Sequence, residues 1–297
     1  RVRRPPLHDR HARCGPDRDQ DGEVVSITRR LSQTGTLSLM AHAGWTREQL
    51  VKALSLYCQI PFGKIDRRNP TIMALAAAIG RTPSAVSLKL VNFASLDPEL
   101  RGRGIGGMGN TSKADRDVWA EFYGRWDVLA ENAVVVEVPP APPEATSGAK
   151  RQRKAPAVAP IGPTEVPREV AQRRGQNFFR AAVFAAHDYK CCITGITCDA
   201  LLRASHIVPW ASDETLRLDP RNGLCLNALH DAAFDRGLIT FTDQFELKLS
   251  KRLKAEVPEP IYAEMFEDRV GTPIAMPKRF KPSVEMMEVH RSKVFRA

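Results

Sequence analysis

The sequence lacks the marks of a membrane or secreted protein. No apolar run approaches the roughly 20 residues that a helix needs to span a bilayer. There is no pattern of basic start, apolar run and small-residue cleavage site. Six cysteines among 297 residues, without such a signal, do not suggest a disulfide scaffold. We therefore expect a cytoplasmic protein that has no membrane partner.

Acidic residues are in deficit. The chain has 34 Asp and Glu against 44 Lys and Arg, which gives a formal net charge of +10. Such an excess favours a polyanionic partner, because neutralised phosphates release their counterions. Composition alone leaves a generic basic protein as the alternative. The length allows two domains of ordinary size.

Regular periodicity is missing from residues 1–39, which are rich in Arg, Asp, Pro and Gly. The first methionine is Met40. Two interpretations stay open for this segment. Translation starts at Met40 and the segment is a non-native leader, or the segment is a genuine disordered basic arm.

Four helices are predicted within residues 40–132, and the last of them follows a capping box between Ser112 and Asp115. The first begins at Thr46 with a capping box, the second follows Asn69 with Thr71 as its cap, and the third follows Thr82. Helix, Gly-containing turn and helix is the spacing of a helix-turn-helix unit, whose second helix enters the major groove. We predict a DNA-binding domain, with a plain helical hairpin as the alternative. Its candidate DNA contacts are Arg81, Ser84, Ser87 and Lys89.

Residues 133–170 are rich in proline and alanine and carry the basic cluster Lys150–Lys154. Repeated prolines preclude regular structure, so we predict a semi-stiff linker between two domains. The cluster either binds phosphates non-specifically or is simply solvated.

Residues 171–297 form the second predicted domain. Its elements are a helix from Arg173, a strand at Ile193, a strand over Leu201–Val208, a short strand over Leu224–Leu226, a helix over Asn227–Asp235, a β-hairpin over 238–249 and a helix from Ser283. Three polar residues stand out within it. Asn222 lies sixteen residues after His206, and His230 lies eight residues after Asn222.

These residues and the strings around them resemble the HNH endonuclease superfamily. The strings are a Cys-Ile-Thr-Gly turn, a Ser-His-Ile-Val-Pro-Trp strand and an Asn-Gly-Leu-Cys-Leu segment leading to Leu-His and Phe-Asp-Arg-Gly. They are similar to those of a bacterial subgroup described as restriction endonucleases. The resemblance implies a ββα-metal fold over about residues 173–297. The expected class is therefore α+β: an all-α helix-turn-helix-like domain, a Pro-rich basic linker and an HNH nuclease domain.

Each of the three residues has a predicted role. A neutral imidazole can take a proton from water, which suits His206 as the general base. The amide of Asn222 can hold the base or a loop in register. His230 can ligate a divalent metal that polarises the scissile phosphate. The resemblance implies a single ion, Mg²⁺ with Mn²⁺ as the alternative, and a cut that leaves a 5′-phosphate.

The sequence also departs from the usual pattern of the family. Ser205 stands where many members place an Asp or His metal ligand. Asp235 is a second candidate for the metal site; otherwise it would anchor an arginine. No Cys-x-x-Cys pair is present, so we do not expect structural zinc. His290 is a lesser catalytic candidate whose position favours a structural or phosphate-facing role. Predicted phosphate contacts are Arg174, Gln176, Arg180, Arg203 and Arg221.

The sequence thus predicts a metal-dependent endonuclease that acts on double-stranded DNA, of restriction or modification-dependent defence type. Two-strand cleavage requires two sites, so we expect a homodimer. One alternative is a DNA-binding regulatory protein whose HNH fold has weak catalysis or none. Another is a nuclease that acts on RNA.

Overall fold

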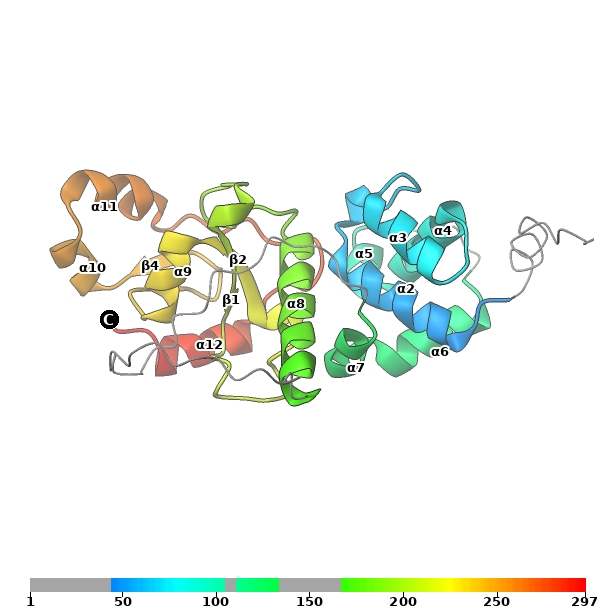
Figure 1. Cartoon of the computed structure of the whole chain (residues 1–297). Helices are drawn as coiled ribbons and strands as arrows, with labels where there is room; N and C mark the ends of the chain where they lie inside the picture. The colour runs from blue at the N-terminus through cyan, green and yellow to red at the C-terminus, as the bar shows by residue number, and fades with distance from the viewer. Residues whose placement is uncertain (1–43, 105–110, 134–166) are drawn as a thin grey trace, which may run out of the picture.

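The computed structural model describes residues 44–104, 111–133 and 167–297. Most of the predicted linker, and everything predicted for residues 1–39, lies outside these ranges. A helical part and a mixed part lie on opposite sides of the long helix α8 (Pro167–Ala186) in Figure 1. Helices combined with two small sheets agree with the predicted α+β class.

The helical part follows the predicted caps closely. Its elements are α2 (Arg47–Gln59), η1 (Phe62–Lys64), α3 (Pro70–Ala78), α4 (Pro83–Leu96), α5 (Pro98–Arg101), α6 (Lys113–Phe122) and α7 (Trp126–Glu131). The capping box between Thr46 and Gln49 is confirmed. The cap of α3 is Asn69 and not Thr71, because the Asn69 side chain accepts from two backbone amides while Pro70 fills the first helical position.

Helices α3 and α4 meet at 106°, which lies in the range of helix-turn-helix units. Both bury apolar side chains in the helical core, including Leu75 and Phe93. Within the described ranges, no single helix has the length and apolar composition to span a membrane, although α3 and α4 meet that test when taken together.

The mixed part is built on a two-stranded antiparallel ribbon of β1 (Leu202–His206) and β2 (Gly223–Asn227). Helix α8 packs on one face of the ribbon and α9 (Ala228–Asp235) on the other. The short helices η2 (Asp199–Leu201) and η3 (Pro220–Asn222) precede the two strands. The strand predicted at Ile193 is wrong. The chain turns there, with Gly195 at φ +75° donating its amide to the Cys191 carbonyl.

Close packing of α8 depends on Gly223, the residue paired with His206 across the ribbon. A Cβ at Gly223 would lie 2.3 Å from Val183 Cγ2 and 2.9 Å from Phe179 Cζ. Only glycine therefore lets α8 approach β2 so closely. This approach also brings Phe179 against the end of β1.

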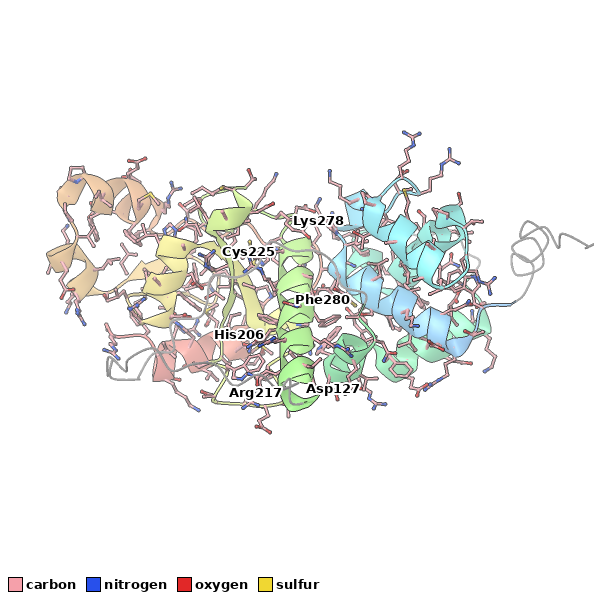
Figure 2. All side chains as sticks on the ribbon, viewed as in Figure 1. Asp127, His206, Arg217, Cys225, Lys278 and Phe280 are labelled. Atoms are coloured by element: carbon pink, nitrogen blue, oxygen red, sulfur yellow. The ribbon has the colours of Figure 1, made fainter. Side chains whose placement is uncertain are left out.

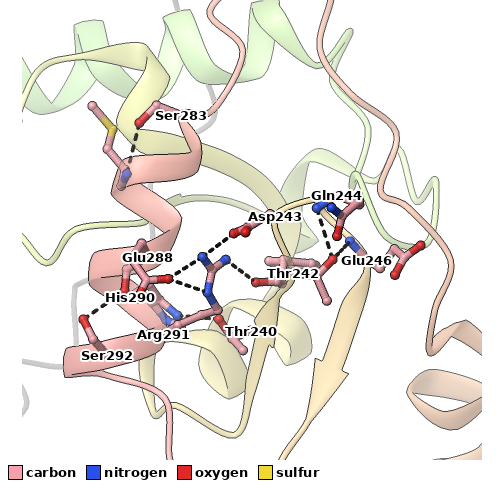
Figure 3. A network of polar contacts seen from close by, with 12 residues as sticks. Thr240, Thr242, Asp243, Gln244, Glu246, Ser283, Glu288, His290, Arg291 and Ser292 are labelled. Carbon is pink, nitrogen blue, oxygen red and sulfur yellow. Dashed lines mark hydrogen bonds and ion pairs between the residues drawn. The ribbon is translucent and has the colours of Figure 1, made fainter.

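The predicted hairpin is confirmed as β3 (Ile239–Phe241) and β4 (Leu247–Leu249). Helix α12 (Val284–Lys293) lies against it, and its Arg291 reaches the Phe241 carbonyl and the Asp243 carboxylate (Figure 3). His290 is buried, with Nδ1 2.9 Å from Thr240 Oγ1 and Nε2 3.2 Å from the Phe234 carbonyl. Its role here is structural. The mixed part also contains α10 (Lys251–Glu256), α11 (Glu259–Met265) and η4 (Glu267–Arg269), which the sequence did not predict.

The two parts share a core as well as a covalent connection. Phe280 packs among aromatic rings of the helical part, including Trp126 at a ring distance of 5.4 Å. Arg279 is fully buried and donates to the carbonyls of Tyr57 (2.9 Å) and Ile60 (2.7 Å). The predicted linker extends too far, because α8 already begins at Pro167. Proline is tolerated there because it lies in the first turn of the helix.

Candidate active site

His206 ends β1 and is partly buried between two rings. Its imidazole lies flat on Phe179 of α8, with ring centroids 3.9 Å apart, and meets Trp210 edge-on at 5.5 Å. Figure 2 shows His206 on one side of α8 and Phe280 on the other. Burial lowers the pKa of His206, and the Arg217 carbonyl only partly opposes this effect. The ring is therefore neutral at physiological pH.

The tautomer of His206 follows from one contact. Nε2 lies 3.0 Å from the carbonyl oxygen of Arg217. A carbonyl can only accept, so Nε2 carries the hydrogen and Nδ1 keeps its lone pair. Nδ1 is the nitrogen that can take a proton.

Asn222 holds the loop that supplies this carbonyl. Its Oδ1 accepts from the Val208 amide (2.7 Å), and its Nδ2 donates to the carbonyls of Val208 (3.1 Å) and Leu216 (3.2 Å). The Arg217 side chain braces the same loop, with Nε donating to the Trp210 carbonyl at 2.8 Å. Asn222 thus supports His206 indirectly. It holds Leu216, and the carbonyl of the next residue, Arg217, contacts the His206 ring.

His230 does not fit the metal role predicted for it. The ring is fully buried, with Nδ1 2.8 Å from Asn227 Nδ2 and Nε2 2.8 Å from the Met265 carbonyl. Asn227 caps α9 through its Oδ1, which accepts from the Leu229 and His230 amides, so Nδ2 must face the ring. Nδ1 therefore accepts and Nε2 donates. Neither nitrogen is left for a metal ion, because the cap directs this side chain into the core beside α11.

A different pair of oxygens lies on the α9 face of the ribbon. Ser205 Oγ is buried, and no hydrogen bond of good geometry reaches it within the described residues. It lies close enough to the Asp231 carboxylate to lower its pKa, although burial outweighs this and raises the pKa overall. Sequence reasoning did not select Asp231. Two signals together could have indicated it. Alternation along β1 turns Ser205 away from His206, and Asp231 lies in the first turn of α9.

Other metal-ligating side chains do not converge. Across residues 44–104, 111–133 and 167–297, no three His, Cys, Asp or Glu side chains gather as a metal cluster. Asp235 is exposed near the end of α9. Cys191, Cys192 and Cys225 are buried thiols and Cys198 is exposed.

The DNA contacts predicted on the helical part are only partly exposed. Ser84 is exposed and Ser87 half-buried. Lys89 is buried in an ion pair with Asp115 at 2.7 Å, so it does not fit a DNA contact; α6 presents that carboxylate to α4. Arg81 bonds to Gln49 Oε1 at 3.0 Å and lies over the Trp45 ring.

The contacts predicted around the ribbon also differ in exposure. Arg174 is exposed, and Gln176 and Arg203 are half-buried. Arg180 is buried over the Phe184 ring and does not fit a surface contact. Arg221 is exposed and pairs with both carboxylate oxygens of Asp219, with Nε 3.0 Å from each.

The ribbon, α9 and the supported histidine agree with the fold expected for this part of the chain. Residues 191–242 match the family model described as HNH endonuclease, and this match supports membership of the HNH superfamily for this segment. No curated protein matches the chain. The family match suggests nuclease activity in general and implies DNA as the substrate. HNH nucleases generally use a divalent metal.

Proposed function

We propose that the protein is a metal-dependent DNA endonuclease of restriction type, with His206 as the general base. The observation that carries this proposal is the neutral imidazole whose Nε2 donates to the Arg217 carbonyl, leaving Nδ1 with its lone pair. Nδ1 takes a proton from a water molecule as its oxygen attacks phosphorus. The phosphorus–O3′ bond breaks, the leaving oxygen takes a proton from solvent, and a 5′-phosphate remains. Burial disfavours the imidazolium, which favours return of its proton to solvent.

A divalent ion would neutralise charge on the phosphate and on the leaving oxygen. Mg²⁺ and Mn²⁺ prefer oxygen donors. Ser205 and Asp231 offer a buried hydroxyl and a neighbouring carboxyl, and two oxygen donors of this kind fit such an ion. His230 does not, for the reason given by its two hydrogen bonds.

The helical part would hold the DNA. The 106° angle between α3 and α4 and the exposure of Ser84 at the start of α4 support this role. Arg174 on α8 adds exposed positive charge.

Cleavage of both strands would use two copies of the chain, acting in the cytoplasm. The mass in solution by light scattering, with and without DNA, tests the dimer; a monomeric mass in both conditions contradicts it.

One observation favours a second candidate, a DNA-binding regulator with a catalytically weak HNH fold. Within the described residues no three metal-ligating side chains converge, and both nitrogens of His230 are engaged. A regulator would need the fold and the positive charge but not the ion.

A plasmid-cleavage assay separates the two. Wild type and His206→Ala would be compared with Mg²⁺, Mn²⁺ and EDTA on unmodified, methylated and hydroxymethylated DNA. We expect metal-dependent cleavage by wild type and a loss of about a hundredfold or more in the variant. Gln244→Ala, an exposed change on the β3–β4 turn, serves as the matched control. Unchanged cleavage by His206→Ala contradicts the base assignment. Binding without cleavage on all three DNAs favours the regulator.

A further inference from the structure

The outer face of α3 and α4, where helix-turn-helix docking would place DNA, offers little positive charge. Its exposed side chains include Met73 and Leu88. Arg81 and Lys89 are the only cations of these two helices and their turn, and both bond to other residues of the helical part. Contacts with phosphates supply a large share of the affinity of a protein for DNA. Those of the helical part must therefore come from another surface.

A basic loop (residues 64–68) leads into α3 and carries the charge that this face lacks. Lys64, Arg67 and Arg68 are exposed, and none of them forms an ion pair within the described residues. The loop is braced by Asn69, whose Nδ2 donates to the Lys64 carbonyl at 3.1 Å. Three available cations are therefore held on one short segment.

The basic loop borders a groove of about 580 Å³ that lies between the two parts. The helical part contributes Ile60 and Lys64 to its wall, and the mixed part contributes Lys190, after the end of α8, and Asp199 of η2. Arg279 donates to the Ile60 carbonyl at 2.7 Å and so ties the two walls together. The groove therefore has a fixed shape in the folded chain.

The chain leaves α8 in a strained conformation beside this groove. Asp188 and Tyr189, which both line it, have φ values of 52° and 57°. Residues other than glycine are uncommon in this left-handed region, and such strain persists where the surrounding structure or a function requires it. The turn brings Lys190 to the groove, exposed and without an ion-pair partner among the described residues, while Lys278 neutralises Asp188 at 3.2 Å.

The balance of charge on this surface is positive. The only carboxylates of the basic loop and the groove that form no ion pair are Asp66 and Asp199, and the first of these accepts from the Arg68 amide at 2.8 Å. We infer that the basic loop and Lys190 bind phosphates of the DNA backbone; this rests on the proposed function, whose substrate is DNA. Exposed cations suit this partner because they bind phosphates whatever the base sequence, and so position a duplex without reading it.

The basic loop lies within reach of a duplex that occupies the candidate active site. Asp199 of η2 lines the groove, η2 leads directly into β1, and His206 ends β1. The five residues of β1 span about 13 Å, which is the length of about four base pairs of DNA. One duplex can therefore meet both the basic loop and His206.

The salt dependence of DNA binding tests the inference without relying on cleavage. The full chain carrying His206→Ala would be titrated against a fluorescent double-stranded oligonucleotide in EDTA at several salt concentrations, with anisotropy as the signal. Adding Lys64→Ala, Arg67→Ala and Arg68→Ala together should raise the dissociation constant by on the order of tenfold or more and reduce its log–log slope against salt by about two to three. Lys190→Ala alone should reduce the slope by about one.

A matched control removes three charges from α10, which lies at the opposite end of the molecule from the helical part (Figure 1). Lys251→Ala, Arg252→Ala and Lys254→Ala change the net charge by the same amount, but Arg252 and Lys254 are already paired with Glu256 and Glu267. The dissociation constant should stay within about twofold, because charges this far away are screened. The thermal transition shows that each variant is folded.

An unchanged dissociation constant and slope in the folded loop variant overturns the inference, even if wild type cleaves DNA. Equal losses in the loop and α10 variants also overturn it, because net charge alone would then explain binding. Absence of DNA binding, or tighter binding of double-stranded RNA of the same sequence, overturns the choice of DNA as the partner. Conversely, DNA binding that requires the basic loop, in a wild type that cuts no DNA, supports the surface while the nuclease proposal fails.

Discussion

The imidazole of His206 and the phenyl ring of Phe179 lie face to face, with their planes 5° apart. The phenyl ring keeps water from one face of the imidazole, and burial is the main cause that lowers the pKa of His206. The base must be neutral to act, so wild-type activity should persist below pH 6.5, the ordinary pKa of histidine.

We predict that Phe179→Ala raises the pKa of His206 and moves the acid limb of the kcat/KM profile to higher pH. Profiles of wild type and variant between about pH 4.5 and 8, with NMR titration of the imidazole, measure the shift. Phe179→Leu keeps apolar cover and should shift the limb less. Coincident acid limbs in wild type and Phe179→Ala would show that the stack does not set the pKa.

Asn222→Ala should slow cleavage without weakening DNA binding. The variant loses the hydrogen bonds of the Asn222 side chain with Val208 and Leu216. The loop is then no longer held in place, so the Arg217 carbonyl no longer fixes the His206 ring. A misplaced base costs on the order of a hundredfold in rate. Single-turnover cleavage gives the rate, and gel-shift titration gives the affinity. A variant that binds DNA poorly but cuts bound DNA at the wild-type rate would assign Asn222 to binding instead.

Arg279→Met should destabilise the whole protein by about 3 kcal/mol, because two buried carbonyls at the end of α2 lose a charged donor. Urea unfolding followed by tryptophan fluorescence measures the change. The neighbouring Lys278→Met removes an exposed ion pair with Asp188 and should cost no more than about 0.5 kcal/mol. Equal effects from the two variants would argue against a specific role for Arg279.

Acid should destabilise the protein through His290. Burial lowers its pKa to about 4, with Arg291 adding to the effect and the Phe234 carbonyl opposing it. Because the folded pKa lies below the unfolded value, the unfolded chain takes up the proton first as the pH falls. Stability is therefore lost between about pH 6.5 and pH 4. His187, whose pKa burial also lowers to about 4, adds a loss of the same sign.

The contribution of His290 is about 2 kcal/mol between pH 7 and pH 5. We predict that His290→Gln reduces the pH dependence of the unfolding free energy by about that amount, as measured by urea unfolding at both values. Thr240→Val, which removes the hydroxyl beside Nδ1, should destabilise the protein while keeping most of the slope. An unchanged slope in His290→Gln would mean that another group controls acid stability.

Short-range chemistry explains which parts of the fold could be read from the sequence. The box between Thr46 and Gln49 spans one helical turn, and the β3–β4 hairpin closes over a few residues, so their signals lie side by side. The strand predicted at Ile193 failed for a local reason as well. The positive φ at Gly195 and its bond to Cys191 close a turn instead.

Residues of the candidate site were recognisable by type, but their surroundings were not. His230 finds its acceptor at Met265, thirty-five residues further along the chain, and nothing near His230 in the sequence indicates this contact. Lys89 is buried because Asp115 arrives from α6, twenty-six residues away. Exposure, and hence availability to metal or DNA, depends on such distant partners.

The contact between Arg279 and Tyr57 can form only late in the synthesis of the chain. The two residues are separated by 222 positions, and a ribosome adding about 5–20 residues per second needs on the order of 10–40 s to make that stretch. During this time the last carbonyls of α2 lack their donor, and the place of Phe280 among the aromatic rings is empty. We therefore expect the helical part to stay labile until the segment after the nuclease motif has been synthesised. The helical part, which would hold DNA, then becomes stable only after the mixed part, which would cut DNA, has been synthesised.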